Sequence, residues 1–288
     1  MNWKRPLRDT LIMLGGVVAV MFVASWALNG LGNPNDIQNY YEVNLGHPYH
    51  EPYLGTSSFV YSPPAALLVS WLHLLPFPFV ATAQRLLQSA ALLVLAGPFT
   101  PIAIFTPQVA SELNLGNINI YLALLAIAGL RWPKLWSLVL ITKPSCAVGL
   151  LWFVARRDWA ALRGVLAVTA GFVIVSVILI PQAWVGYFGV VTHPAPTLDG
   201  MPVLWLRLPI AAVVAVVGSL RTWRPAIVIS VWLGLPVWEL VSPVVLVGLL
   251  AFLWQSPVLD PAWRRGPADT QPPRVKATRF RGQSAAIE

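Results

Sequence analysis

Long apolar runs with few or no charged residues recur along almost the whole 288-residue chain. They lie at residues 11–28 and at roughly 64–76, 80–97, 118–130, 135–155, 164–180, 203–219 and 226–254. Only 10% of the residues are Asp, Glu, Lys or Arg, against about 25% in a typical soluble domain. So few charges cannot cover a water-soluble protein of this size, and so much apolar sequence excludes a disordered chain. The pattern predicts an all-α, polytopic membrane protein.

Several of these runs are shorter than the ~20 residues that cross a bilayer, or contain Pro and Gly. Broken helices occur in membranes only where protein or a water-filled cavity shields the freed backbone groups. Residues 135–155 have basic residues at both ends and Thr142-Lys143-Pro144 near the middle, which predicts a re-entrant hairpin of two half-helices. Residues 226–254, interrupted at 234–236, predict two short crossings. We expect eight crossings and one hairpin, a bundle of about 8–10 transmembrane or half-membrane helices.

The first apolar run follows Lys4, Arg5 and Arg8, as in a signal peptide, and residues 25–27 resemble a cleavage site. The run is longer than the usual apolar region of a signal peptide, and the rest of the chain is membrane-embedded. The sequence therefore favours a retained transmembrane helix.

Basic residues are unevenly distributed between the predicted loops. Segments 30–62, 98–117 and 181–203 contain no Lys or Arg, whereas 16 of the 19 basic residues lie at the termini and in the other connections. The positive-inside rule places these basic regions, including both termini, in the cytoplasm, and the three loops without basic residues, each of which contains an acid, on the extracytoplasmic side. The net charge of +8 thus reflects polarity across the plasma membrane, and we expect no nucleic-acid partner.

Two regions follow from this pattern. Residues 1–257 form one membrane-embedded domain, whose first outer loop covers residues 30–62. Residues 258–288 are polar, Pro-rich and basic, which is typical of a disordered cytoplasmic tail attracted to anionic membrane lipids.

The first outer loop is much longer than an ordinary helix connection. It contains Asp36, followed by Tyr40 and Tyr41, and ends near Tyr61. Pro34 and Asn35 predict a turn before a short helix from Asp36 to Tyr41, on which Asp36 and Tyr40 share one face. Asp36 is therefore either a functional carboxylate or an acid favoured by the helix dipole at an N-terminus.

The order of several short motifs resembles glycosyltransferase family 87, which belongs to the GT-C membrane enzymes and includes polyprenol-phosphate-mannose-dependent mannosyltransferases. The motifs are the Asp36 to Tyr41 segment, Gly46-His-Pro-Tyr49, the segment 59–68, Leu113-Asn-Leu-Gly-Asn-Ile-Asn119, Thr142-Lys-Pro144 with Arg156-Arg-Asp-Trp159, and Leu235-Pro-Val-Trp-Glu-Leu240. The chain is shorter than usual for the family, and Asn117 stands where the family has Gln.

The resemblance implies transfer of a hexose, with mannose as the first candidate, from a polyprenyl-phosphate donor to a hydroxyl of a lipid or glycan acceptor. The reaction would take place on the extracytoplasmic face with inversion, and Asp36 would be the general base that deprotonates the acceptor. A second carboxylate, which glycoside hydrolases need, would be unnecessary because the leaving phosphate requires no proton donor. The donor would be a substrate, and no cofactor or metal is expected.

Three basic residues, Arg85, Lys143 and Arg207, are not explained by topology. An ionisable group in a membrane segment is a functional hypothesis. Arg85 lies near the predicted cytoplasmic start of its helix, where snorkelling of the side chain is the simpler explanation. For Lys143 the alternatives are contact with the donor phosphate and structural pairing. For Arg207 they are phosphate contact and snorkelling towards the outer surface.

Other loop residues are weaker candidates for substrate contacts. His50 and His193 can donate to a phosphate, although a surface histidine is the more common outcome. Tyr40, Tyr41 and Tyr61 suit either sugar contact or an interfacial aromatic belt. Glu112 and Glu239 are acids on the predicted outer side, and the sequence assigns neither a role.

Two further classes of function compete with the enzyme. One is a transporter or flippase of a lipid-linked substrate, but an internal repeat and paired intramembrane acids, which are typical of such carriers, are not evident. The other is a catalytically inactive relative of GT-C enzymes. The acidic, Tyr-rich first outer loop favours the glycosyltransferase over the transporter, and activity alone separates the enzyme from an inactive relative.

Overall fold

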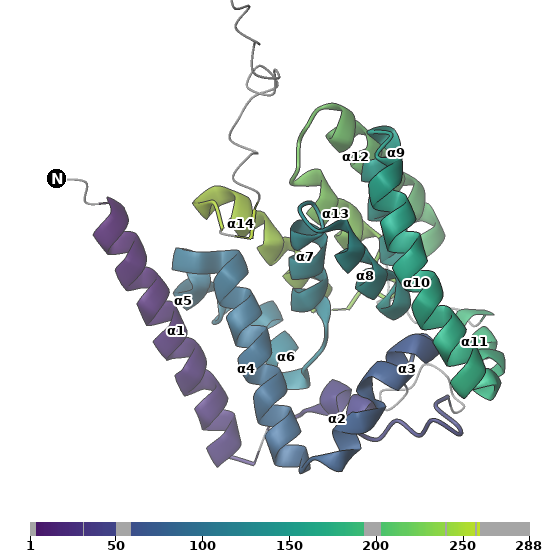
Figure 1. Cartoon of the computed structure of the whole chain (residues 1–288). Coiled ribbons are helices and arrows are strands. Elements are labelled where there is room, and N and C mark those ends of the chain that lie inside the picture. The colour runs from purple at the N-terminus through teal and green to yellow at the C-terminus, as the bar shows by residue number, and fades with distance from the viewer. Residues whose placement is uncertain are drawn as a thin grey trace, which may run out of the picture.

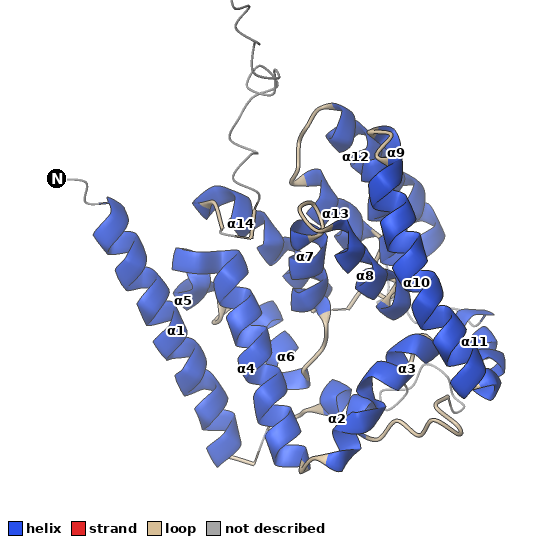
Figure 2. Ribbon diagram, in the orientation of Figure 1, coloured by secondary structure: helices blue, strands red, loops and turns tan. Residues whose placement is uncertain are grey.

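Helices make up every regular element in the part of the chain that the structure describes (Figure 2). The computed structural model describes residues 4–30, 32–49, 59–192, 203–239, 241–256 and 258–259. In hydrocarbon each backbone polar group needs an internal partner, and a helix supplies these partners within one segment. The predicted all-α fold class is confirmed. All but two residues of the predicted tail lie outside the described residues.

Three helical stretches among these residues are long and apolar enough to cross a membrane. They are most of α1 (Lys4–Leu28), the stretch from α4 (Phe77–Ala96) through η2 (Gly97–Phe99) and α5 (Thr100–Ala103), and α10 (Trp159–Leu179). At 1.5 Å per residue, α1 and α10 are roughly 37 and 31 Å long, which suits a hydrocarbon core of about 30 Å. Few of the residues of α1 and α10 are buried inside the protein, so most of their surface would face lipid.

The remaining helices are shorter. They are α2 (Asn35–Tyr41), α3 (Pro63–Val69), η1 (Ser70–Leu74), α6 (Pro107–Leu115), α7 (Asn119–Ala128), η3 (Pro133–Leu135), α8 (Trp136–Thr142), η4 (Pro144–Leu150), α9 (Leu151–Ala155), α11 (Pro181–Thr192), α12 (Leu204–Leu220), α13 (Ala226–Leu233), η5 (Ser242–Val247) and α14 (Gly248–Trp254). Figure 1 shows α6, α7 and α8 between α4 and α10. The predicted short helix at Asp36–Tyr41 is present as α2.

The predicted hairpin at residues 135–155 is confirmed. Lys143 interrupts the helix with φ −129° and ψ 82°, between α8 and η4. The chain then folds back, because the Trp136 ring at the start of α8 lies against Gly149 and, at 6.5 Å between centroids, against Phe153. Trp136 is fully buried and therefore fixes the two arms of the hairpin against each other.

The prediction of two short crossings at residues 226–254 is wrong. The helix α13 has eight residues, about 12 Å of rise, which is less than half of the hydrocarbon thickness. After α13 the chain turns back and continues as η5, which contacts both α13 and α7. This segment therefore forms a second pair of short helices that pack against each other.

A third reversal replaces the predicted outer loop at 98–117. In its place α5 packs against the middle of α1, where Thr100 contacts Gly15, and Gly97 lies against Trp254 at the end of α14. The chain then runs through α6 and turns at residues 116–118 into α7. Several apolar residues in 98–117 are buried in the core, which a solvated loop would not permit.

The start of α4 also differs from the prediction. Residues 64–76 do not form a helix of spanning length, because α3 and η1 are short and both pack beside α2. The hydroxyl of Tyr41 donates to the carbonyl of Leu75 at 3.0 Å, and its ring contacts Phe77 edge-on. The start of α4 therefore lies at the same end of the molecule as α2, the end predicted to be extracytoplasmic. Among the described residues, three helical stretches are long enough to cross a membrane, and most of the other apolar segments form shorter helices.

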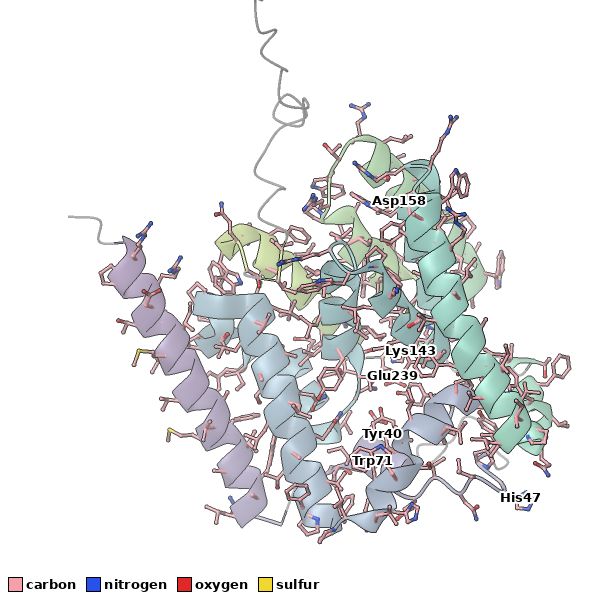
Figure 3. All side chains as sticks on the ribbon, in the orientation of Figure 1. Tyr40, His47, Trp71, Lys143, Asp158 and Glu239 are labelled. Atoms are coloured by element: carbon pink, nitrogen blue, oxygen red, sulfur yellow. The ribbon has the colours of Figure 1, made fainter. Side chains whose placement is uncertain are left out.

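The structure also differs from the outer loop predicted at residues 181–203. Residues 181–192 form α11, on which Tyr187 contacts Tyr49 of the first loop at 5.8 Å between ring centroids. Residues 193–202 lie outside the described residues. The two ends of the molecule remain distinct, because Asp158, next to Arg156 and Arg157, lies far from His47 (Figure 3).

The hairpin makes a direct prediction about stability. A Cβ added at Gly149 would lie 2.4 Å from the Trp136 ring, so we expect Gly149→Ala to overpack the core and to lower the free energy of unfolding by about 2 kcal/mol. Gly171 lies in α10, where an added Cβ would meet no heavy atom within 4 Å. Gly171→Ala should therefore leave stability unchanged or raise it slightly. Thermal unfolding in detergent measures both, and equal stability of the two variants would contradict the described hairpin.

Candidate active site

The helix α2 carries Asp36 in its first turn, after Pro34 at the N-cap. A carboxylate in this position is favoured by the helix dipole. The structure therefore agrees with the interaction between Asp36 and the helix dipole that the sequence suggested. The same helix buries Ile37 and Tyr40, and this buried face turns Asp36 towards the protein interior, where it is half-buried. A short helix and its apolar anchors therefore determine where the carboxylate lies.

Ile37 fits over Gly116, which ends α6 in a left-handed conformation with φ +77°. A Cβ at Gly116 would come within 2.1 Å of Ile37. A second contact joins the same segments, because the backbone N–H of Asn33 donates to Oδ1 of Asn114 at 3.0 Å. The α6–α7 reversal and α2 are thus fixed against each other.

Asn117 and Asn119 follow Gly116 in this reversal, and both are nearly fully buried. The carbonyl oxygen of Asn117 accepts a hydrogen bond from the Gln88 side chain of α4. The side chain of Asn119 lies between two charged groups, the Glu112 carboxylate and the Lys143 ammonium. Hydrogen bonds to Asn117 and Asn119 therefore connect α4, α6 and the 135–155 hairpin.

Lys143 lies at the tip of that hairpin. Its Nζ donates to Oδ1 of Asn119 at 2.9 Å and, more weakly, to Oδ1 of Asn117 at 3.4 Å. The structure therefore shows structural pairing for Lys143, one of the alternatives from the sequence. It also places the ammonium near Asp36, so phosphate contact stays a prediction.

Asp36 faces three groups from three different reversals. Asn117 donates to its carboxylate, Lys143 contributes a nearby positive charge, and Glu239, in the segment between α13 and η5, contributes a negative one. Burial is the largest effect and raises the pKa of Asp36 to about 6, with Glu239 acting in the same direction and Lys143 and Asn117 opposing it. In the view of Figure 3 the labels of both Lys143 and Glu239 lie near the centre.

Tyr40 and Tyr61 form the other side of this region. Their hydroxyl oxygens lie 2.9 Å apart, their rings meet edge-on with centroids 5.5 Å apart, and both side chains are buried. Burial and the nearby Asp36 carboxylate both raise the pKa of Tyr61, so the hydroxyl stays protonated. An interfacial aromatic belt, the alternative for these two residues, is wrong because belt residues are exposed at the membrane surface. Sugar contact stays a prediction.

Tyr41 is not part of this cluster. Its hydroxyl donates to Leu75, and its half-buried ring supports the start of α4. His50 and His193 lie outside the described residues, so their predicted phosphate contacts stay predictions.

Arg207 is buried in α12, so the snorkelling considered from sequence is wrong. Its guanidinium donates to the carbonyls of Leu233 and Leu235 and lies 4.3 Å from the centre of the Trp238 ring, which in turn stacks on Trp232. Arg207 therefore holds the segment that carries Glu239. Its contact with a phosphate stays a prediction.

Arg85 is buried as well, so its predicted snorkelling is also wrong. Its guanidinium donates to the carbonyls of Leu113 and Asn114 and lies 5.0 Å from the centre of the Trp26 ring. These carbonyls belong to the last turn of α6, where helical partners are absent. Arg85 therefore satisfies the end of α6 and joins it to α1.

Sequence reasoning left Glu112 and Glu239 without a role and did not identify Asn117 or Asn119 as site residues. Glu112 is fully buried, although the sequence placed it in a solvated loop. The sequence does contain one indication of these roles, because an acid lies close to two Asn residues within an apolar stretch. In a membrane protein such polar residues usually pair with other groups inside the protein. The clustering itself depends on the reversals and cannot be read from spacing.

These side chains combine a proton acceptor with a cation. Asp36 is half-buried with a pKa close to neutral, and Lys143 lies nearby but is held by amides. Such a pair can deprotonate a hydroxyl and stabilise an anion that develops on a leaving group. Among the described residues no three His, Cys, Asp or Glu side chains gather as metal ligands, and the expectation that no metal is required stays a prediction.

Comparison with known families gives one match. The sequence model of glycosyltransferase family 87 matches residues 59–265. This range includes Lys143, Glu112 and Glu239, whereas α2 with Asp36 precedes it. No curated protein and no solved structure matches the chain.

The contact between Ile37 and Gly116 can be tested by mutation. Gly116→Ala would introduce a left-handed alanine and a clash with Ile37, so we expect the free energy of unfolding to fall by about 2 kcal/mol. The double variant Gly116→Ala/Ile37→Ala should lose less than the sum of the two single changes, because removal of the isoleucine relieves the clash. Thermal unfolding measures the coupling, and additive effects would show that α2 is not docked on this turn.

Proposed function

Because the chain belongs to glycosyltransferase family 87 and is therefore a membrane glycosyltransferase, we propose that it transfers a hexose from a polyprenyl-phosphate donor to a hydroxyl acceptor. Mannose is the first candidate for the hexose, and a lipid or glycan carries the acceptor hydroxyl. The observation that carries this proposal is the convergence of Asp36 and Lys143, which supplies one base and one cation as the reaction requires.

Asp36 acts as the general base in this proposal. The acceptor oxygen forms a bond to the anomeric carbon, its proton passes to the Asp36 carboxylate, and the bond between the anomeric carbon and the phosphate oxygen breaks with its electron pair left on the phosphate. A single displacement inverts the anomeric centre. A carboxylate with a pKa of about 6 accepts a proton more readily than an ordinary aspartate and is still ionised near neutral pH.

Lys143 stabilises the phosphate that leaves. Negative charge accumulates on the phosphate oxygens as the sugar bond breaks, and a fixed ammonium in a region of low dielectric constant lowers the energy of that state. Asn117 contacts both groups, since its side chain donates to Asp36 and accepts from Lys143. The base and the cation therefore have a common support.

Tyr40 and Tyr61 line the sugar side of the site in this proposal. Their rings are buried against each other, so the contact that they offer to a sugar is polar and comes from the paired hydroxyls. The site opens on the extracytoplasmic side, because the first outer loop has no basic residues and the basic connections lie at the other end. The donor's polyprenyl chain would remain in the bilayer.

The central experiment measures transfer from labelled polyprenyl-phosphate mannose in membranes. We expect Asp36→Asn to lower kcat by about 10²–10⁴-fold, the usual contribution of a general base, with unchanged expression. Glu42→Gln is the matched control, because Glu42 lies at the end of the same helix and its side chain accepts a hydrogen bond from the exposed Gln38 side chain. Near wild-type turnover by Asp36→Asn would exclude Asp36 as the base.

The pH dependence follows from the raised pKa of Asp36. The base must be deprotonated, so kcat/KM should be constant above the pKa and fall about tenfold per pH unit below about 6. Initial rates between about pH 4.5 and about 8 measure this profile. A profile that stays flat down to an ordinary aspartate pKa of about 4 would contradict the described burial of Asp36.

A further inference from the structure

Glu112 lies in the last turns of α6 and is fully buried. Its Oε1 accepts hydrogen bonds from the backbone N–H groups of Asn119, at 2.6 Å, and Ile120, at 3.2 Å. These are N–H groups of the first turn of α7, which have no helical partners. The residue at the N-cap, Ile118, has no side chain that could accept them, so α7 depends on a carboxylate from the preceding helix.

The second oxygen of Glu112 has a different effect. Its Oε2 accepts from Nδ2 of Asn119 at 3.1 Å. An amide has donors on one atom and an acceptor on the other, so this bond turns Oδ1 of Asn119 away from Glu112. That oxygen accepts from Nζ of Lys143 at 2.9 Å. The carboxylate therefore determines which way Asn119 points and what it offers to the ammonium.

Lys143 needs such a support because its side chain has many rotamers. Without the two amides, the ammonium would be drawn into a direct ion pair with Asp36, whose charge lies nearby. Among the described residues no carboxylate oxygen lies within 4.0 Å of its Nζ. The two amides thus keep the cation close to the base without neutralising it.

The hydrogen-bond count of the ammonium agrees with this arrangement. An ammonium has three N–H donors, and Asn117 and Asn119 accept two of them. The third is left for an anionic oxygen. The amide acceptors are neutral, and the Glu112 and Asp36 carboxylates interact with the ammonium without touching it. Its third N–H therefore stays available to the phosphate.

We propose that Glu112 is a positioning residue, which fixes the ammonium of Lys143 through Asn119 at the place where the phosphate of the donor binds. This inference rests on the proposed function and extends it from Asp36 and Lys143 to a buried carboxylate two contacts away from the substrate. Glu112 does not touch the reacting atoms. Its effect is on donor binding and on the charge that stabilises the leaving phosphate.

A double-mutant cycle on KM for polyprenyl-phosphate mannose tests the inference. We expect Lys143→Met and Glu112→Gln each to raise the donor KM by about tenfold or more, the scale of a lost charge-assisted contact. The double variant should be no worse than Lys143→Met alone, because Glu112 acts through Lys143. Additive effects, or a wild-type donor KM in Glu112→Gln, would overturn the proposal.

Two further variants separate positioning from capping of α7. Asn119→Leu keeps the shape and leaves Glu112 bound to the backbone of α7, but it removes the link to Lys143, so we expect the same rise in donor KM. If Glu112→Gln does not fold, the donor KM of Asn119→Leu still tests whether the link to Lys143 is needed. Thr106→Ala removes the side-chain cap of α6, where Oγ1 accepts from Val109 N–H at 3.4 Å, and should lower the thermal stability measurably, as the loss of such a cap usually does, without a change in donor KM.

Three other results would contradict the inference or the proposed function. A rise in donor KM in Thr106→Ala equal to that in Glu112→Gln would show that general loosening of α6 is sufficient, and would overturn the inference. An unchanged donor KM in Asn119→Leu would do the same. If the wild-type enzyme transferred no sugar from a polyprenyl phosphate, the proposed function itself would fail, and this result precedes any comparison of variants.

Discussion

The structure depends on one constraint, which is that a chain that reverses inside a bilayer must satisfy the backbone groups freed at the turn. In the part of the chain that the structure describes, three segments reverse between short helices, at residues 116–118, at 142–144 and after the end of α13 at Leu233. Buried polar groups from elsewhere support these turns. Glu112 accepts the first N–H groups of α7, and Arg207 donates to the carbonyls at the end of α13. Polar side chains are required at these turns, and this requirement brings the charged residues together.

The candidate site is a consequence of the same constraint. The fit of Ile37 over Gly116 holds α2 in place. Its Asp36 then interacts with one side chain from each turn, Asn117, Lys143 and Glu239. Asp36 is thus under the influence of one cation, Lys143, and of a second acid, Glu239. Since neutral amides hold the ammonium, its charge persists close to a base whose pKa is raised by burial. Structural support and proposed chemistry thus use the same few polar residues.

The sequence predicted the parts of this arrangement that are local. The charge content indicated a membrane protein, the Thr142-Lys143-Pro144 break indicated a hairpin, and the residues after Pro34 indicated the helix of Asp36. Each of these depends on properties of neighbouring residues. The sequence failed where long-range packing decides the outcome. Residues 98–117 have no basic residue and were interpreted as an outer loop, but they form α5 and α6 because their apolar side chains fill the core beside α1 and α4.

The same distinction applies to the site residues. Asp36, Tyr40, Tyr61 and Lys143 could be identified singly from residue type and position, and the structure brings them together. The snorkelling assigned to Arg85 failed because a helix direction predicted from charge placed it at the wrong end. The roles of Glu112 and Asn119 could not be predicted, because their meaning lies in a chain of hydrogen bonds across separate elements.

The most direct test of the proposed site is a cryo-electron-microscopy structure of the full chain with a bound polyprenyl phosphate. We expect the phosphate to lie within hydrogen-bond distance of the Lys143 ammonium, with space on its sugar side that faces the Asp36 carboxylate. A phosphate bound at the opposite end, beside the basic connections that contain Arg156 and Arg221, would contradict the roles proposed for Asp36 and Lys143.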